Sequence, residues 1–280
     1  MSNPVFSSSP VFGERRRGAA PVAYAPNAYG TAGGVTADAA ALEQMYGAPA
    51  ATTRDTGRLT YDDVIVKTGG LLLLLIVVAA ATWQIEPRIW PIGMVVGLVL
   101  GLVNSFKREP SPALIIAYTV AEGVFLGGIS LAFQNMTIDG ATGTAEPIVL
   151  QAILGTFATF GAALFLYKSG RVRVTAKSMR FFLIALAGYA VFSLLNFGLS
   201  FFMASDGFGP LRNGWMGIGV GLLAVGLAAY SLIVDFDAIE RGVRQGVPAK
   251  FAWSAAFGLV VTLVWLYLEI LRLLAMFNRN

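Results

Sequence analysis

Three acidic side chains interrupt long apolar stretches of the sequence, where an ionised group is costly. Glu122 lies in AYTVAEGVFLGG, Asp235 follows an uncharged run in SLIVDFDAIERG, and Glu269 lies in LYLEILRLL. An ionisable side chain inside a membrane span costs at least ~2.5 to 3.5 kcal/mol on insertion scales, so it usually faces the bundle interior, a partner or a water-filled cavity. The three carboxylates are therefore candidates for an ion path or for pH sensing, with any bound metal unknown.

Each carboxylate also has a purely structural interpretation. Glu122 could be a protonated acid that is hydrogen-bonded to a neighbouring helix, with Asn196 or Gln151 as its partner. Asp235 could be an interfacial aspartate within an acidic stretch of the chain. Glu269 precedes Arg272 by three positions, a spacing that places both side chains on one helix face and allows them to pair.

Composition indicates a multi-pass membrane protein. The 280 residues are 56% hydrophobic and only 13% charged, with a mean hydropathy of +0.68. The chain has no Cys and no His, which excludes thiol nucleophiles, disulfides, imidazole bases and the usual zinc or haem ligands. We therefore expect no enzymatic activity and no cofactor. The basic residues lie in connections between spans, which predicts a lipid bilayer and not a nucleic acid as the partner.

Residues 1–58 are rich in Ala, Gly, Pro and Ser, which predicts a disordered cytoplasmic tail. No apolar core follows the arginines at 15–17, so the tail is not a secretory signal peptide. Ordered structure is expected to begin at Thr60, which can cap a helix, while Asp63 favours the positive N-terminal end of that helix.

Residues 59–280 are predicted to form an all-α transmembrane domain of seven helices, with the last helix central in the bundle. A span needs about 20 apolar residues to cross the hydrocarbon core. The first two segments are marginal in length, and a re-entrant pair is the alternative for them. The predicted spans are 67–84, 89–106, 112–133, 147–167, 179–204, 214–236 and 251–277.

The distribution of basic residues predicts the orientation. The connections after the second, fourth and sixth spans hold nine Lys and Arg residues, whereas the opposite connections and the C-terminal end hold three. The nine are Lys107, Arg108, Lys168, Arg171, Arg173, Lys177, Arg241, Arg244 and Lys250, and the three are Arg88, Arg212 and Arg279. The positive-inside rule then places the N-terminus in the cytoplasm and the C-terminus outside, in agreement with seven crossings.

The rise of about 1.5 Å per helical residue gives each carboxylate a depth. Glu122 lies ~15 Å into its span, at the bilayer centre, and Asp235 lies towards the cytoplasmic face. Glu269 lies ~27 Å from the cytoplasmic start of the last span, near the outer face. Two carboxylates that share a proton could serve an intramembrane aspartic protease, but Asp235 and Glu269 are too far apart for that reaction.

The segments AEGVFLGGIS, LQAILGTFATFGAALF, LLNFGLSFF, LIVDFDAIERG and LYLEILRLL resemble successive spans of the Bax inhibitor family, also called the transmembrane BAX inhibitor motif family, and particularly its bacterial branch. The resemblance covers about residues 90–277. It implies seven helices with the last surrounded by the other six, in a bacterial plasma membrane. It also implies a pH-sensitive calcium leak, closed by a hydrogen-bonded pair of acidic residues from the sixth and seventh helices.

Carried onto this chain, the aspartate of the sixth helix falls on Asp235. Matching the family's LYLD to LYLE selects Glu269 as the second acid, whereas matching the terminal LR without gaps selects Thr262, about two turns nearer the cytoplasm. The depths favour Thr262, which cannot titrate. Asp235 would then need another partner, for which Arg180 at the cytoplasmic end of the fifth span is a candidate.

Two function classes remain in view. Intramembrane carboxylates and backbone oxygens are suitable hard ligands for calcium, which favours a cation leak with calcium as the permeant ion. The alternative is a non-transporting regulator of other membrane proteins or of membrane proteolysis, whose partners would be other membrane proteins.

Overall fold

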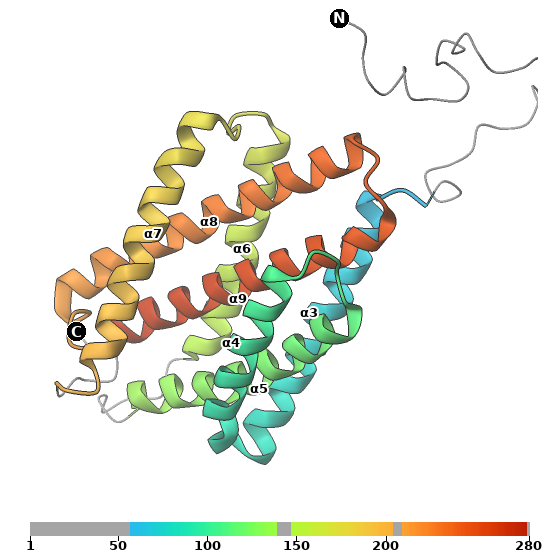
Figure 1. Cartoon of the computed structure of the whole chain (residues 1–280). Helices are drawn as coiled ribbons and strands as arrows, with labels where there is room; N and C mark the ends of the chain where they lie inside the picture. Colours follow the sequence, from blue (N-terminus) through green and yellow to red (C-terminus); the bar gives the residue numbers. More distant parts are fainter. Residues whose placement is uncertain (1–56, 139–146, 204–208, 279–280) are drawn as a thin grey trace, which may run out of the picture. The chain divides into compact units, whose positions relative to one another are not determined.

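The computed structural model describes residues 57–138, 147–203 and 209–278. The predicted tail, residues 1–58, lies outside these ranges except for Gly57 and Arg58. Figure 1 shows the described part as a bundle of helices, whose labels are used from here on.

Seven long helices make up the described part of the chain, and each is long and apolar enough to cross a membrane. They are α3 (Tyr61–Ile85), α4 (Trp90–Phe106), α5 (Pro112–Ile138), α6 (Ile148–Lys168), α7 (Ala176–Leu199), α8 (Gly214–Arg244) and α9 (Ala252–Phe277). Two short 3-10 helices, η1 (Pro87–Ile89) and η2 (Ala249–Phe251), precede α4 and α9. The predicted all-α membrane fold is confirmed. The 25 residues of α3 and the 20 of Pro87–Phe106 favour two crossings over a re-entrant pair.

Local chemistry explains where two of the helices begin and end. The Thr60 hydroxyl accepts a hydrogen bond from the backbone N–H of Asp63 at 3.1 Å, so the predicted cap of α3 is confirmed. Helix α8 continues eight residues beyond its predicted apolar end, because Asp237 pairs with Arg241 one turn later and Glu240 pairs in the same way with Arg244. It stops where Gly246 adopts a φ of 67°, and the N–H of Val247 bonds to the carbonyl of Gly242.

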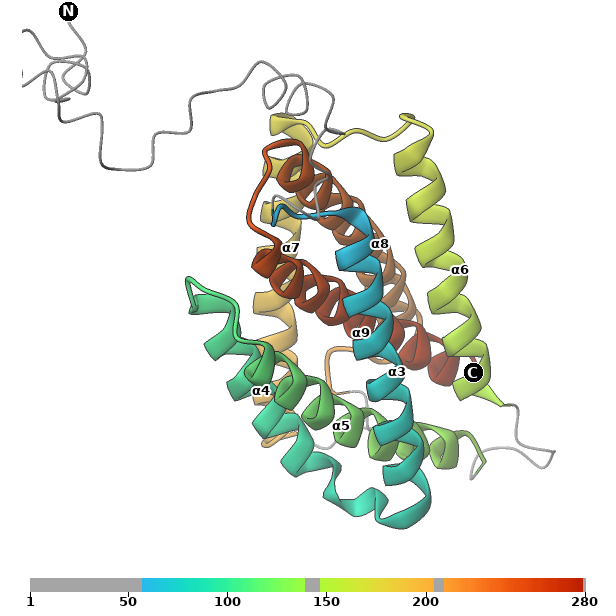
Figure 2. The same ribbon diagram turned by 90° about the vertical axis from the view of Figure 1, so that its right-hand side faces the viewer.

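Helix α9 lies in the centre of the bundle, as predicted. It is the most buried of the seven helices and packs against α3, α5, α6 and α8. Figures 1 and 2 both draw it in the middle of the bundle. Helix α4 packs on α5 and η1, while α7 packs on α8.

Helix α5 approaches its neighbours backbone to backbone. A Cβ built on Gly127 would lie 2.3 Å from the carbonyl oxygen of Ala79 in α3, and one built on Gly128 would lie 2.3 Å from the carbonyl oxygen of Pro87 in η1. Real Cβ contacts are never so short, so only glycine fits at these two positions. Small residues of this kind allow membrane helices to pack closely.

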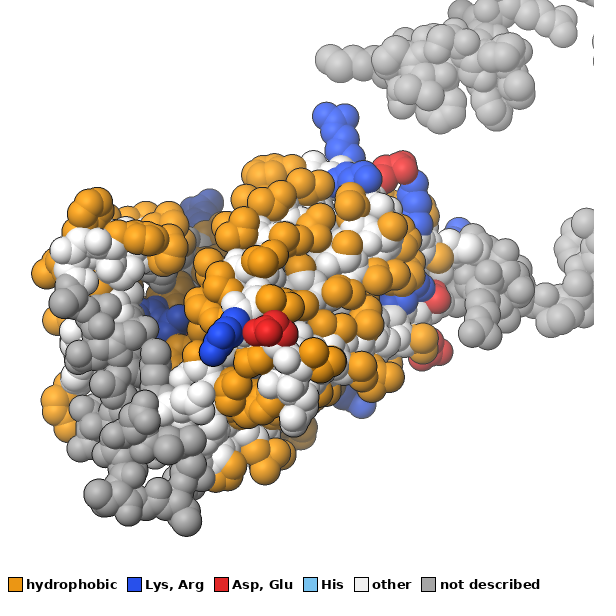
Figure 3. All heavy atoms as spheres, turned by 90° about the horizontal axis from the view of Figure 1, so that it is seen from below, with side chains coloured by type: hydrophobic (Ala, Val, Ile, Leu, Met, Phe, Trp, Pro, Cys, Tyr) orange, Lys and Arg blue, Asp and Glu red, His pale blue; other side chains and the backbone are white. Residues whose placement is uncertain are grey.

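The surface of the bundle is largely apolar. Many Leu, Ile, Val and Phe side chains of α3, α4, α6 and α7 are exposed. Figure 3 shows one such face, on which charged side chains are few and lie mainly near one edge. A surface of this composition is suited to contact with lipid tails rather than with water.

Nine basic residues lie in the connections after α4, α6 and α8 or in the helix ends beside these connections. The end of the bundle formed by these connections and by the start of α3 is called the basic end. Lys250, beside α9, forms an ion pair with Glu109 of the α4–α5 connection at 2.8 Å. The backbone of Gly57 accepts a hydrogen bond from Ala249, and Leu59 donates one to Val247. These contacts fix the start of α3 to the α8–α9 connection.

Candidate functional site

Asp235 of α8 is hydrogen-bonded to Thr262 of α9 inside the bundle. The Thr262 hydroxyl donates to Asp235 Oδ2 at 2.7 Å, and the threonine is buried while the aspartate is half-buried. Arg180 is exposed and forms no hydrogen bond or ion pair with another described residue, so it is not the partner of Asp235 in this structure. Thr262 is the residue that the gap-free match to the family's terminal LR selects, and it is the residue that contacts Asp235.

A pocket of about 460 Å³ leads to Asp235 from the basic end. Its walls include Gln245 and Val247 of the α8–α9 connection and Ser254 and Gly258 of α9. Leu59, just before α3, also lines it and is itself buried. The carboxylate of Asp235 thus lies within the helix bundle and faces a pocket that extends to the α8–α9 connection.

Glu122 of α5 lies against α4 rather than beside Asp235. A Cβ on Gly97 of α4 would be 3.0 Å from Glu122 Oε1, so the two helices meet closely at this carboxyl group. Tyr118 lies one turn earlier on α5, and the buried Oε2 of Glu122 has no hydrogen-bond partner among the described residues. The suggested partner Asn196 lies at the α7–α8 connection, where its side chain accepts from the N–H of Leu211 at 2.9 Å.

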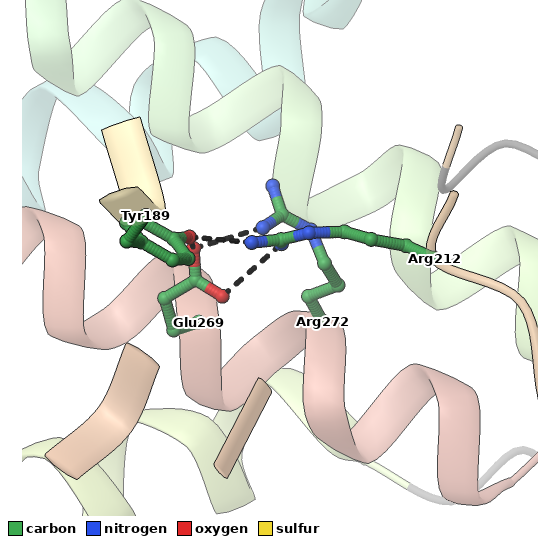
Figure 4. A network of polar contacts seen from close by, with 4 residues as sticks. All are labelled: Tyr189, Arg212, Glu269 and Arg272. Atoms are coloured by element: carbon green, nitrogen blue, oxygen red, sulfur yellow. Dashed lines mark hydrogen bonds and ion pairs between the residues drawn. The ribbon is translucent and has the colours of Figure 1, made fainter. Parts of the chain in front are cut away.

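Glu269 of α9 is the centre of a buried charged cluster, which Figure 4 shows from close by. Arg272 donates to Glu269 Oε1 at 2.9 Å, as its spacing predicted, and Arg212 of the α7–α8 connection lies 3.3 Å from Oε2. The Tyr189 hydroxyl of α7 also donates to Oε1, and it accepts from Arg212 Nη2 at 2.6 Å. Only 3% of the surface of Glu269 and 2% of that of Arg212 is exposed.

Asp235 of α8 and Glu269 of α9 lie apart along the bundle, as the helix rise predicted. Thr262 and Glu269 are seven residues apart, or about 10.5 Å along the axis. Asp235 contacts Thr262, whereas Arg212 of the α7–α8 connection contacts Glu269. The structure therefore brings Asp235 and Thr262 together, and Glu269 and Arg272 together, but it does not bring Asp235 to Glu269.

Arg212 and Tyr189 were not among the residues selected from the sequence. Arg212 was counted only as a basic residue of a short connection, and its one signal was that few basic residues occur on that side. Tyr189 is one aromatic among many in an apolar span. Nothing in the spacing of either residue shows that Arg212 contacts both Tyr189 of α7 and Glu269 of α9.

A larger cavity lies away from all three carboxylates. It has a volume of about 600 Å³ and lies between α3, α5, α6 and α9, with mostly apolar walls. Its polar groups include Ser130 and Tyr267, whose hydroxyls are hydrogen-bonded to each other at 2.7 Å. We place the candidate site at the smaller pocket, because that pocket is lined by a carboxylate, that of Asp235.

Comparison with known proteins agrees with this architecture. A search of curated proteins gave no match. The model of the family described as Bax inhibitor 1 like matches residues 3–279, nearly the whole chain. Seven apolar helices fit an integral, multi-pass membrane protein, and the chain belongs to the Bax inhibitor 1 like family.

Proposed function

We propose that the protein is a pH-sensitive cation leak, with calcium as the permeant ion and Asp235 as its control point. One observation carries the proposal: Asp235 is a half-buried carboxylate with a single neutral hydroxyl partner, and it faces a pocket that extends to the α8–α9 connection. Such a group can exchange protons and cations with water while it stays inside the bundle.

Protonation of Asp235 would change two interactions together. The ionised carboxylate accepts the hydrogen bond from Thr262 and attracts a cation, whereas the neutral acid attracts a cation far less and can donate instead. Carboxylate, hydroxyl and backbone oxygens are the ligands that calcium prefers. The protonation state of Asp235 would therefore make the passage of calcium depend on the pH at the basic end.

Calcium flux into liposomes that contain the pure protein, measured across a range of pH, tests this proposal. Asp235→Asn should change the flux and flatten its pH dependence, because the amide cannot titrate. Asp237→Asn is the matched control, since Asp237 lies on the same helix but pairs with Arg241 at 2.9 Å. It should keep the pH dependence of the wild type.

Two results would contradict the proposal. Flux that matches empty liposomes at every pH would remove the leak and favour a non-transporting regulator of other membrane proteins. Flux that keeps its pH dependence in Asp235→Asn but loses it in Glu122→Gln would move the control point to the α4–α5 contact.

We further propose that the basic end is cytoplasmic, from the nine-to-three distribution of basic residues. The chain has no native Cys, so single cysteines can be labelled cleanly. An impermeant thiol reagent outside intact cells should label Asn213→Cys, in the exposed α7–α8 connection, and not Ser169→Cys, in the exposed α6–α7 connection. The reverse pattern would overturn the orientation.

A further inference from the structure

Two polar side chains with partners on other helices, Thr262 and Glu269, share one face of α9. Thr262 and Glu269 are seven residues apart, which is close to two full turns, so both side chains point to the same side of the helix. Thr262 meets Asp235 of α8, while Glu269 meets Tyr189 of α7. Trp265 lies between them and contacts the ring of Tyr189, with 5.7 Å between the ring centroids. A cation that passed Asp235 along this face would reach the Glu269 cluster next.

Arg212 lies at the Glu269 end of this face. Its guanidinium carbon lies 5.2 Å from the ring centroid of Tyr189 and 5.7 Å from that of Phe192, so the charged group rests against two aromatic side chains. Its Nε is buried without a hydrogen-bond partner among the described residues. The backbone just before it is held in place, because Leu211 donates to the side chain of Asn196 in α7.

The charges of the cluster do not cancel. Two guanidinium groups, those of Arg212 and Arg272, face the single carboxylate of Glu269, which leaves a net positive charge. Charges act strongly on each other inside a bundle, since the effective dielectric constant is far below that of water. A cation approaching the Glu269 end of this face would therefore be repelled unless Arg212 moved away.

Helix α7 is attached to the rest of the bundle through few side chains, and one of them, Tyr189, belongs to this cluster. Its inward side chains Phe182, Tyr189 and Asn196 recur every seven residues, and only the first and last of them are buried. Phe182 packs on Tyr230 of α8, and the other two reach the cluster and the α7–α8 connection. Most other apolar side chains of α7 are exposed, and Figure 1 draws the helix at one side of the bundle.

We propose that Arg212 is the closing residue at the end of the ion path opposite the basic end. Paired with Glu269 and Tyr189, it holds α7 against α9 and places a fixed positive charge across the path that begins at Asp235. Opening this end requires Arg212 to withdraw with its connection, which frees α7 to move. The inference rests on the proposed cation leak and adds a second gate, distinct from Asp235.

Flux measurements on Arg212→Gln test the gate. The variant should raise calcium flux several-fold at every pH and keep the pH dependence, because Asp235 is intact. Tyr189→Phe keeps the ring but loses both hydrogen bonds of the hydroxyl, and should raise flux less. Arg88→Gln, at an exposed arginine beside α4, is the control and should match the wild type. Unchanged or lower flux in correctly folded Arg212→Gln and Tyr189→Phe would overturn the gate.

A distance measurement tests the same inference without flux. Spin labels on Leu194→Cys in α7 and Leu98→Cys in α4, both highly exposed positions, report the place of α7 relative to the rest of the bundle. Arg212→Gln and Tyr189→Phe should each broaden the distance distribution, the first more than the second. If the wild type carries no flux, the leak fails while this measurement still decides whether Arg212 holds α7. An unchanged distribution in both variants would refute that role.

Discussion

Asp235 and Glu269 are both carboxylates within membrane-spanning helices, yet their surroundings differ in kind. Asp235 has one hydrogen bond, from a neutral hydroxyl, and borders a pocket. Glu269 has two arginines and a tyrosine around it and is almost completely buried. Loss of the charge of Asp235 leaves no ion-pair partner behind, whereas loss of the charge of Glu269 leaves the buried Arg212 without its counter-ion.

The comparison shows that burial of a carboxylate does not by itself indicate its role. What separates a group that can switch from one that fixes structure is the number and charge of its partners. Glu269 also joins two helices and a connection, whereas Asp235 joins two helices only.

The largest expected effect comes from Glu269→Gln. Removing one member of a buried ion pair costs about 3 to 5 kcal/mol, because the remaining charge is left without compensation. Asp235→Asn leaves no cation unpaired and retains an acceptor for Thr262, so its loss of stability should be much smaller. Unfolding of the two variants in the same detergent measures this difference. Equal losses would show that the two carboxylates are not as different as their contacts indicate.

A smaller effect is expected from Thr262→Val, which removes the only hydrogen bond that Asp235 receives within the described chain. Hydrogen bonds to charged groups contribute about 1.5 to 3 kcal/mol, and the loss should lie in that range when unfolding is measured at neutral pH. Thr262→Ser keeps the hydroxyl and should recover most of the stability. If serine and valine have the same effect, packing at this position matters more than the hydrogen bond.

The ion pair between Glu109 and Lys250 joins a glutamate to a basic side chain, as the buried Glu269 cluster does, but it is exposed to solvent. The hydrogen bond from Lys250 holds the pKa of Glu109 below its ordinary value. The pair therefore stabilises the folded protein above the ordinary glutamate pKa, and this contribution is lost as pH falls through the lowered pKa. Because solvent screens the pair, Glu109→Gln should barely change the unfolding temperature at neutral pH and should slightly reduce its fall in acid. A loss comparable to that of Glu269→Gln would contradict the comparison.

No change is expected when residues 1–56 are removed. Their composition offers too little apolar area to offset the ordering of the chain. The truncated protein keeps Gly57, whose carbonyl accepts from Ala249, and should insert, purify and unfold like the full chain. Aggregation of the truncated protein, or a shifted unfolding temperature, would assign the tail a part in folding.

Length and hydropathy were sufficient to predict the seven helices, because a membrane span leaves a signal of about 20 apolar residues. The end of α8 could not be predicted in that way, since its last turns are polar and are held by ion pairs along the helix. The helix rise alone predicted that Asp235 and Glu269 lie apart along the bundle, and their separate contacts confirm this. The contact of Glu269 with Arg212 depends on where a residue of the α7–α8 connection lies. The periodicity of apolar residues does not predict that position.

The glycine contacts of α5 limit which parts of this bundle can act as machinery. Where backbone meets backbone, as at Gly127 against Ala79 and at Gly128 against Pro87, no side chain can rotate to make room. The helices α3, α4 and α5 therefore form a rigid frame, because their backbones are in direct contact. We expect movement within the bundle on the other side of α9, where α7 is attached through side-chain contacts that can break.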